Sequence, residues 1–180
     1  QNLAYSIAIK TSNIRISDTF LNYYTAIIVR DFLANLTNAS CKIKWPNDII
    51  LNGKKGCGIL IEKKKVENVE YYILGIGINV LQTDFTNLPK AGSVLTATDL
   101  SFDLKEFTNQ FHQYLISRIQ DINPEEEILN IYNQSLFRKD EISVFQKNNL
   151  RQNGIIKNAD KNGFLWIDLE KEGLQKFFHK

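Results

Sequence analysis

The sequence predicts an α+β fold, with strands and helices in one main body and a small β-rich part after it. Apolar and polar residues alternate along short segments such as residues 3–10, which is the pattern of a half-buried strand. Residues 18–36 instead repeat apolar residues at helical spacing. Beyond Leu136, short strand patterns alternate with polar turns. We therefore expect a main domain over residues 1–137 and a small β-barrel over residues 138–180.

The main domain is predicted to combine hairpin strands with long helices. Asn52-Gly53 is typical of a two-residue hairpin turn, so the strands on either side of it are expected to pair. Serine caps helices and proline suits a first helical position, which places helix starts at Ser101 and Pro124. The predicted strands are residues 3–10, 41–45, 49–51, 56–62 and 71–80, followed in the barrel by 142–146, 155–157 and 164–169; the first helix begins at Ser17 or Asp18.

Composition excludes several classes of protein. With 22 basic and 20 acidic residues, the net charge of +2 argues against a nucleic-acid-binding surface. No apolar run approaches the roughly 20 residues that span a bilayer, so we expect no membrane segment. Cys41 and Cys57 are expected to be buried thiols in a reducing cytoplasm. No His, Cys or carboxylate cluster has the spacing of a metal site.

Two stretches carry more chemistry than a plain core needs. Residues 44–48 place a cation, an indole, two polar groups and an anion around the end of a predicted strand. Residues 54–60 combine lysines at a hairpin turn with glycines in the returning strand, where glycine marks the close approach of a ligand or backbone. On an ideal strand Lys55 and Gly58 point to opposite faces. Both serve one site only if Gly58 contributes backbone or Gly56 interrupts the alternation.

A third stretch, residues 75–79, reads as a strand with one bare face. Alternation turns the isoleucines toward the core and leaves Gly75, Gly77 and Asn79 on the other side. A flat hydrogen-bonding ligand fits such a strip, and so does a helix packed against the glycines. Spacing alone leaves both alternatives open. The lysine run at residues 63–65 is expected to be a solvated turn rather than a binding patch.

These three motifs, in this order and at these intervals, resemble the biotin protein ligase family over essentially the whole chain. The resemblance implies a class II synthetase-like catalytic fold, with a mixed central sheet packed with helices, and a C-terminal SH3-like β-barrel. It also implies the reaction. Biotin is activated with ATP and magnesium to biotinyl-5′-AMP, and a lysine of a biotin carboxyl carrier protein then takes the biotin. It leaves open whether the chain forms a homodimer.

The resemblance assigns roles to particular residues. Lys55 is expected to bridge the biotin carboxylate and the α-phosphate. An ordinary carboxylate is too weak a base for a lysine ammonium, so Asp48 is expected to orient the incoming lysine or to help hold the magnesium of ATP, with no other metal. The sequence leaves open whether Lys44 takes part, and Trp45 is expected to form a wall. The implied biotin- and adenylate-binding residues are Lys44, Trp45, Asn47, Gly58, Leu60, Gly75, Gly77 and Asn79.

Departures from the family pattern give further expectations. The family's glycine- and arginine-rich closing loop is not in this sequence, which enters a core strand almost at once. We therefore expect a fragment with a segment upstream, and an isolated 180-residue chain that is nearly inactive. The unpatterned residues 81–100 are expected to order over the adenylate, with Phe85 or Val94 covering the adenine.

Two other functions stay open. A lipoate or octanoate protein ligase shares the fold and the adenylate chemistry, although residues 45–48 favour biotin. A non-catalytic biotin-binding module would bind biotin and ATP without releasing pyrophosphate.

Overall fold

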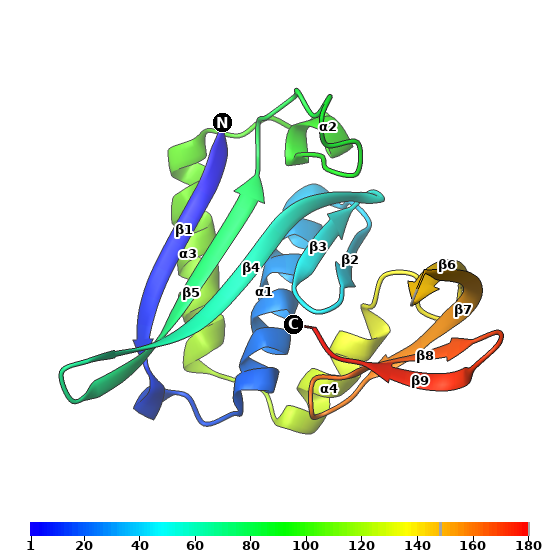
Figure 1. Ribbon diagram of the computed structural model, residues 1–180. Helices are drawn as coiled ribbons and strands as arrows, with labels where there is room; N and C mark the ends of the chain where they lie inside the picture. Colours follow the sequence, from blue (N-terminus) through cyan, green and yellow to red (C-terminus); the bar gives the residue numbers. More distant parts are fainter. Residues whose placement is uncertain (148, 180) are drawn as a thin grey trace.

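The computed structural model describes residues 1–147 and 149–179, and these form two antiparallel sheets with helices against the first (Figure 1). Lys180, the last residue of the expected barrel, lies outside the described residues. Sheet A has the strand order β1-β5-β4-β3-β2, and sheet B the order β6-β7-β8-β9. The strands of sheet A are β1 (Asn2–Lys10), β2 (Cys41–Lys44), β3 (Asp48–Leu51), β4 (Lys54–Val66) and β5 (Val69–Asn79). Those of sheet B are β6 (Ile142–Lys147), β7 (Leu150–Ala159), β8 (Leu165–Leu169) and β9 (Gly173–Phe177).

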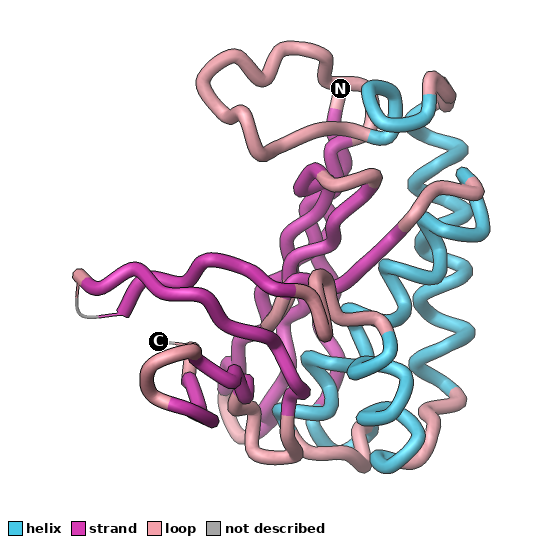
Figure 2. The backbone as a smooth tube through the Cα atoms, turned by 90° about the vertical axis from the view of Figure 1, so that its right-hand side faces the viewer, coloured by secondary structure: helices cyan, strands magenta, loops and turns pink. Residues whose placement is uncertain are grey.

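Helices cover one face of sheet A, and the other face is open (Figure 2). The long helices are α1 (Asp18–Thr37), α3 (Leu104–Gln120) and α4 (Glu125–Gln134). Helix α1 packs centrally, and its Ile28 and Leu33 are fully buried in one core with Ile43, Ile49 and Ile78 of the strands. Burying this apolar surface is the main stabilising contribution to the fold. Among the described residues, no helix is long and apolar enough to cross a membrane.

Most strands and helices lie where the apolar pattern predicts them, including the hairpin turn. Asn52 and Gly53 both have positive φ, 45° and 83°, as a type I′ turn requires. Ser17 is the N-cap residue of α1. The start predicted at Ser101 is wrong, because the Asp103 side chain caps α3 by accepting from the Glu106 amide at 2.9 Å.

The prediction of a turn at residues 63–65 is also wrong. Lys63, Lys64 and Lys65 continue β4 and pair with β5, and the turn follows at Glu67, which has a φ of 54°. This end of the hairpin is exposed on both faces, so no apolar alternation marks it as a strand. Lys63 is tied to the start of α1 by an ion pair with Asp18 at 2.8 Å.

Sheet B is open in its hydrogen bonding but is bridged by side chains. Its four strands form no closing ladder among the described residues, so the barrel stays a prediction. Lys147 at the end of β6 nonetheless pairs with Glu172 in the β8–β9 turn. Gln152, only 5% exposed, donates to the same carboxylate at 3.0 Å. These bonds link the first strand of the sheet to its last turn.

A glycine inside sheet B gives a stability prediction. A Cβ on Gly154 would lie 2.8 Å from Cδ2 of Leu169 and 3.0 Å from Cδ2 of Phe145. Overpacking of this kind costs about 1–3 kcal/mol. We therefore expect Gly154→Ala to lower the unfolding free energy by about that amount in a denaturant titration. Gly77→Ala is the matched control, because its nearest atom would be the Gly58 carbonyl oxygen at 4.0 Å. Equal stability of the two variants would contradict this packing.

Hydrogen bonds join sheet B and the turn after β7 to helices α1 and α4. The Tyr23 hydroxyl of α1 donates to the Asp160 carbonyl at 3.1 Å. Asn133 of α4 exchanges two hydrogen bonds with the backbone of Ala159, at 3.0 and 2.7 Å. Sheet B thereby flanks the open face of sheet A (Figure 2).

Candidate functional site

An open pocket of about 720 Å³ lies on the face of sheet A that the helices leave bare. This volume is within the range of pockets that hold small-molecule ligands. The predicted site residues that line it are Lys44, Trp45, Asn47, Asp48, Lys55, Gly58, Leu60, Gly75 and Gly77, and Pro46, Ile59 and His179 line it as well. Asn79 is the one predicted residue that is absent from this lining.

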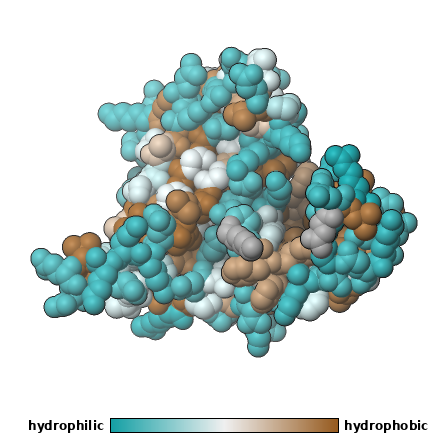
Figure 3. Space-filling view, viewed as in Figure 1, coloured by the Kyte–Doolittle hydropathy of each residue, from teal (hydrophilic) through white to brown (hydrophobic). Residues whose placement is uncertain are grey.

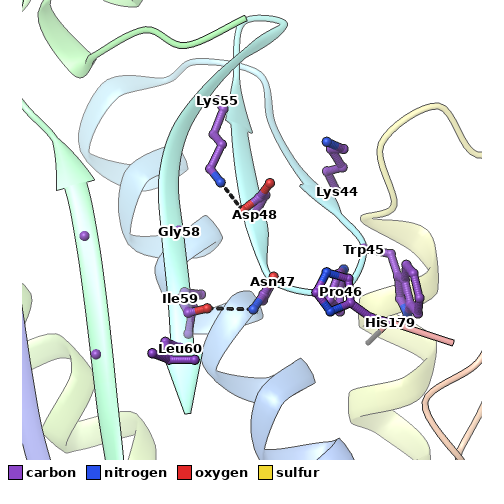
Figure 4. Close-up of a pocket in the computed structure, with 12 residues that line it drawn as sticks. Lys44, Trp45, Pro46, Asn47, Asp48, Lys55, Gly58, Ile59, Leu60 and His179 are labelled. Atoms are coloured by element: carbon purple, nitrogen blue, oxygen red, sulfur yellow. Dashed lines mark hydrogen bonds and ion pairs between the residues drawn. The ribbon is translucent and has the colours of Figure 1, made fainter. Parts of the chain in front are cut away.

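One rim of the pocket is the tight turn between β2 and β3. Its Trp45–Pro46 peptide bond is cis. The Pro46 carbonyl accepts hydrogen bonds from the Tyr132 hydroxyl at 2.8 Å and from Nδ2 of Asn22 at 3.3 Å. Asn47 donates from Nδ2 to the Ile59 carbonyl at 2.6 Å (Figure 4). These bonds fix the turn to helices α1 and α4 and to strand β4. The Asn47 side-chain nitrogen therefore stabilises the rim of the pocket.

Lys55 and Asp48 form an ion pair inside the pocket. Lys55 Nζ lies 2.5 Å from Asp48 Oδ1, and the two side chains are 46% and 20% exposed (Figure 4). The pair lies above Gly58, where an added Cβ would be 3.6 Å from Lys55 Nζ and 3.7 Å from Asp48 Oδ1. Both charges are therefore available to a ligand that rests on the sheet at this position.

A β-bulge explains how Lys55 and Gly58 reach the same face. Ile49 pairs with Cys57, but the next residue, Ile50, pairs with Lys55. Gly56 is therefore the extra residue, and such a bulge reverses the side-chain alternation beyond it. Of the two possibilities that the sequence left open, interruption at Gly56 is the one that the structure adopts.

The floor of the pocket is the glycine strip of β5. Leu74, Ile76 and Ile78 are buried on the helix side, so Gly75 and Gly77 face away from the helices. A Cβ on Gly75 would meet only the Leu60 carbonyl oxygen at 3.6 Å, and one on Gly77 only a carbonyl oxygen at 4.0 Å. Among the described residues no helix packs on the strip, so the alternative of helix packing is wrong. The alternative that the strip is a ligand surface stays a prediction.

An apolar side chain stands beside this strip. Leu60 pairs across the strands with Gly75 and is 60% exposed. Figure 3 shows a pale and brown area between hydrophilic margins near the centre of the molecule. The pocket thus combines an apolar floor with a charged rim.

A model of the biotin/lipoate A/B protein ligase family matches residues 1–79. This part of the chain is therefore similar to that family. The bifunctional ligase/repressor BirA of Bacillus subtilis is 44% identical over 63 residues, which are 34% of this chain and 19% of the relative. The biotin–[acetyl-CoA-carboxylase] ligase of Paracoccus denitrificans is 30% identical over 96 residues, 52% of this chain and 38% of the relative. The chain therefore spans less than half the length of these two curated relatives.

Solved structures of biotin protein ligases share the fold over nearly the whole chain. The biotin protein ligase of Aquifex aeolicus superposes with a TM-score of 0.80 at 20% identity, covering 99% of this chain and 80% of that one. Its complex with biotin and ATP gives a TM-score of 0.78 at 19% identity, with 99% and 75% covered. The mixed α+β fold of this chain is thus the ligase fold.

Asn79 lies outside the pocket lining, and a short helix follows in the connection after it. Asn79 ends β5 and donates from Nδ2 to the Gly92 carbonyl at 3.0 Å. Val94 begins a short helix, α2 (Val94–Thr98), and is fully buried in the core. It is therefore not free to cover an adenine, and that prediction is wrong for Val94. Phe85 is half-buried, and its predicted role remains a prediction.

His179 is the pocket residue that sequence reasoning missed. It follows β9 and meets Trp45 edge to face, with ring centroids 5.8 Å apart (Figure 4). More than 130 residues separate the two rings in the sequence, so no spacing pattern links them. The resemblance of the tail to the family was the only signal that it lies near the site.

The cysteines take no part in the chemistry of this pocket. Both are free and buried. Burial raises the pKa of the Cys57 thiol, and burial raises that of Cys41 to about 11. Both thiols therefore stay protonated near neutral pH and are poor nucleophiles. Within residues 1–147 and 149–179, no three His, Cys, Asp or Glu residues are placed to hold a metal ion.

Proposed function

We propose that this chain carries the biotin and ATP site of a biotin protein ligase, which transfers biotin to a lysine of a biotin carboxyl carrier protein. The observation that carries the proposal is the Lys55 ammonium above the bare glycine backbone of a ligand-sized pocket. The names of the curated relatives support biotin as the substrate. So does the similar Aquifex aeolicus structure in complex with biotin and ATP.

The first half-reaction joins two anions, which repel each other. A biotin carboxylate oxygen attacks the α-phosphorus of ATP, and the bond to the bridging oxygen breaks to release pyrophosphate. Lys55 leaves Asp48 and places its ammonium between the carboxylate and the α-phosphate, where it stabilises the charge that develops. Lys44 adds a second cation on the pocket rim.

The remaining pocket residues hold the substrate in place. Leu60 and Trp45 contact the apolar parts of biotin, and Gly75 and Gly77 let the ligand approach the backbone. Gly58 keeps the floor beneath the ion pair flat. Asn47 fixes the rim, and Asn79 offers its Oδ1 to the adenylate, since Nδ2 is bonded to Gly92.

Magnesium fits this site as a companion of ATP rather than as a resident ion. Asp48 is a single carboxylate and is paired with Lys55, so it supplies too few oxygen ligands for a protein-held cation. Magnesium would arrive on the phosphates, where it would neutralise charge and favour departure of pyrophosphate. Asp48, on β3, would be the pocket carboxylate available to the metal-bearing phosphates.

Asp48 has a second task in the transfer half-reaction. Once Lys55 has turned to the adenylate, the Asp48 carboxylate is free to attract the ammonium of the carrier lysine and to orient it. After this ammonium has lost one proton to solvent, the neutral amine attacks the biotinyl carbonyl carbon, AMP leaves with the bonding electrons, and a second amine proton passes to solvent. The product is an amide.

The proposal extends to the organisation of the chain. Residues 1–137 form the catalytic domain and residues 138–180 an SH3-like domain, of which sheet B supplies four strands. Its His179 closes the pocket beside Trp45. The expected location is the cytoplasm, where the carrier protein and ATP are found together.

A lipoate or octanoate ligase is the second candidate, because the matching family model includes lipoate ligases. The test is ATP–pyrophosphate exchange by the whole protein with biotin, lipoate or octanoate as the acid. We expect exchange with biotin and little with the straight-chain acids, because Trp45 and the turn at residues 44–48 form a wall at one end of the pocket. Preference for lipoate or octanoate would overturn the proposal. Binding of biotin and ATP without exchange would point to a non-catalytic module.

A further inference from the structure

The backbone of Lys55 is held from a part of the chain that is distant in sequence. Strand β5 ends at Asn79, whereas its neighbour β4 begins at Lys54, so the first residues of β4 extend past the end of β5. Residues 89–92, here called the strap, take the place of β5 beside Lys55. The Lys55 amide donates to the Lys90 carbonyl at 2.8 Å, and the Gly92 amide donates to the Lys55 carbonyl at 3.0 Å. These bonds form a parallel bridge between Lys55 and Ala91.

The strap is itself anchored at both ends. At its start, the Lys54 ammonium donates to the Pro89 carbonyl at 2.6 Å. At its end, Asn79 donates to the Gly92 carbonyl at 3.0 Å, which joins the strap to the last residue of β5. Ser93 follows, fully buried, and its hydroxyl donates to the Gln82 carbonyl at 2.6 Å. The strap therefore continues sheet A beyond β5.

Gly92 makes this close approach possible. A Cβ at this position would lie 2.9 Å from the Cβ of Lys54 and 3.4 Å from its Cγ. The Cβ atom of Lys54 is fixed by the backbone, so a side chain on residue 92 can be accommodated only if the strap moves away from β4. Such a movement would break or lengthen the two backbone bonds to Lys55.

The bulge at Gly56 makes this second support important. β3 pairs with Lys55 on one side, but the register shifts immediately after it, so the ladder is irregular at this residue. We propose that the strap is a positioning element for the Lys55 ammonium, and that Gly92 is a positioning residue of the ligase. This inference rests on the proposed function, in which Lys55 faces the carboxylate and the α-phosphate. Misplacement of a catalytic group by about 1 Å costs on the order of a hundredfold in rate.

The test is Gly92→Ala in the whole protein, alone and combined with Lys55→Ala. We expect Gly92→Ala to lower the kcat of biotin-dependent pyrophosphate exchange by about ten- to hundredfold, with a smaller change in the KM for biotin. In the Lys55→Ala background the same substitution should cause little further loss, because the strap acts through the lysine. Lys64→Ala is the control, since Lys64 is an exposed residue of the same strand β4 and lies outside the pocket. It should leave the exchange unchanged.

A second measurement does not depend on catalysis. Deuterium exchange at the Lys55 amide should accelerate in Gly92→Ala and stay unchanged in Lys64→Ala, because that amide is bonded to the Lys90 carbonyl. Ser93→Ala, which keeps the steric fit at Gly92 but loosens the anchor, should act in the same direction by a smaller factor. Ser93→Ala replaces Gly92→Ala as the test variant if Gly92→Ala fails to fold.

The outcomes separate the two proposals. Unchanged deuterium exchange at Lys55 would overturn the strap, whatever the activity. Equal losses from Gly92→Ala with and without Lys55 would also overturn it, because the effect would then be merely structural. An inactive wild-type protein, or a fully active Lys55→Ala variant, would instead overturn the proposed function or the role of Lys55.

Discussion

Replacing Lys55 with alanine in the whole protein is expected to slow biotin-dependent pyrophosphate exchange by about a hundred- to thousandfold. Loss of one preorganised charge-stabilising donor typically costs about 2.7–4 kcal/mol in the transition state. The folded state should change little, because the Lys55 side chain is 46% exposed and surface substitutions usually stay within about 0.5 kcal/mol. Exchange kinetics and a thermal melt on the same preparation measure both effects.

Two further variants sharpen this prediction. Lys55→Arg should restore the exchange only in part, because a planar guanidinium does not replace a compact ammonium between two oxygens. Lys64→Ala is the matched control, since Lys64 is an exposed lysine on the same strand and lies outside the pocket. If Lys55→Ala keeps nearly full exchange activity, Lys55 is only a turn residue and the site assignment is wrong.

Gly77→Val is expected to abolish measurable binding of biotinyl-5′-adenylate without weakening the fold. Position 77 lies on an exposed strand face where even a Cβ would have no atom nearer than 4.0 Å, and valine favours extended backbone. Unfolding free energy should therefore be unchanged or slightly higher. A ligand resting on the strip would meet the new methyl groups. Calorimetry with the adenylate and a denaturant titration test the two halves of the prediction.

Ala4→Val is the matched control for this variant. Ala4 pairs with Gly77 from β1 and is exposed on the same sheet face, but it does not line the pocket. The adenylate should still bind this variant. Normal adenylate binding by Gly77→Val would mean that the glycine strip is not a ligand surface.

The local pattern of apolar and polar residues was sufficient to predict most of the fold. β1 and β5 each have one buried face, and their alternation predicts them correctly. The lysines of β4 failed as a strand signal, because that end of the hairpin has no buried face. The Ser101 cap failed because two acceptable cap residues lie two positions apart, and only packing decides between Ser101 and Asp103.

For the candidate site, too, local sequence pattern predicts some features and long-range contacts set the others. Residues 44–48, 54–60 and 75–79 were recognisable as motifs, and the sheet register brings them to one pocket. The bulge at Gly56 was one of two local possibilities, and only cross-strand pairing selects it. The positions of His179 and of the strap depend on contacts between segments that are far apart in the sequence. No local sequence pattern predicts such contacts.

The most direct test of the central claim is a crystal structure of the whole protein with biotinyl-5′-adenylate bound. We expect the ligand to lie over Gly75 and Gly77, with Lys55 Nζ about 3 Å from a ligand oxygen and its pair with Asp48 broken. The backbone bonds from Lys55 to the strap should persist. An adenylate bound elsewhere, or on this floor with Lys55 still paired to Asp48 and out of reach, would contradict the account.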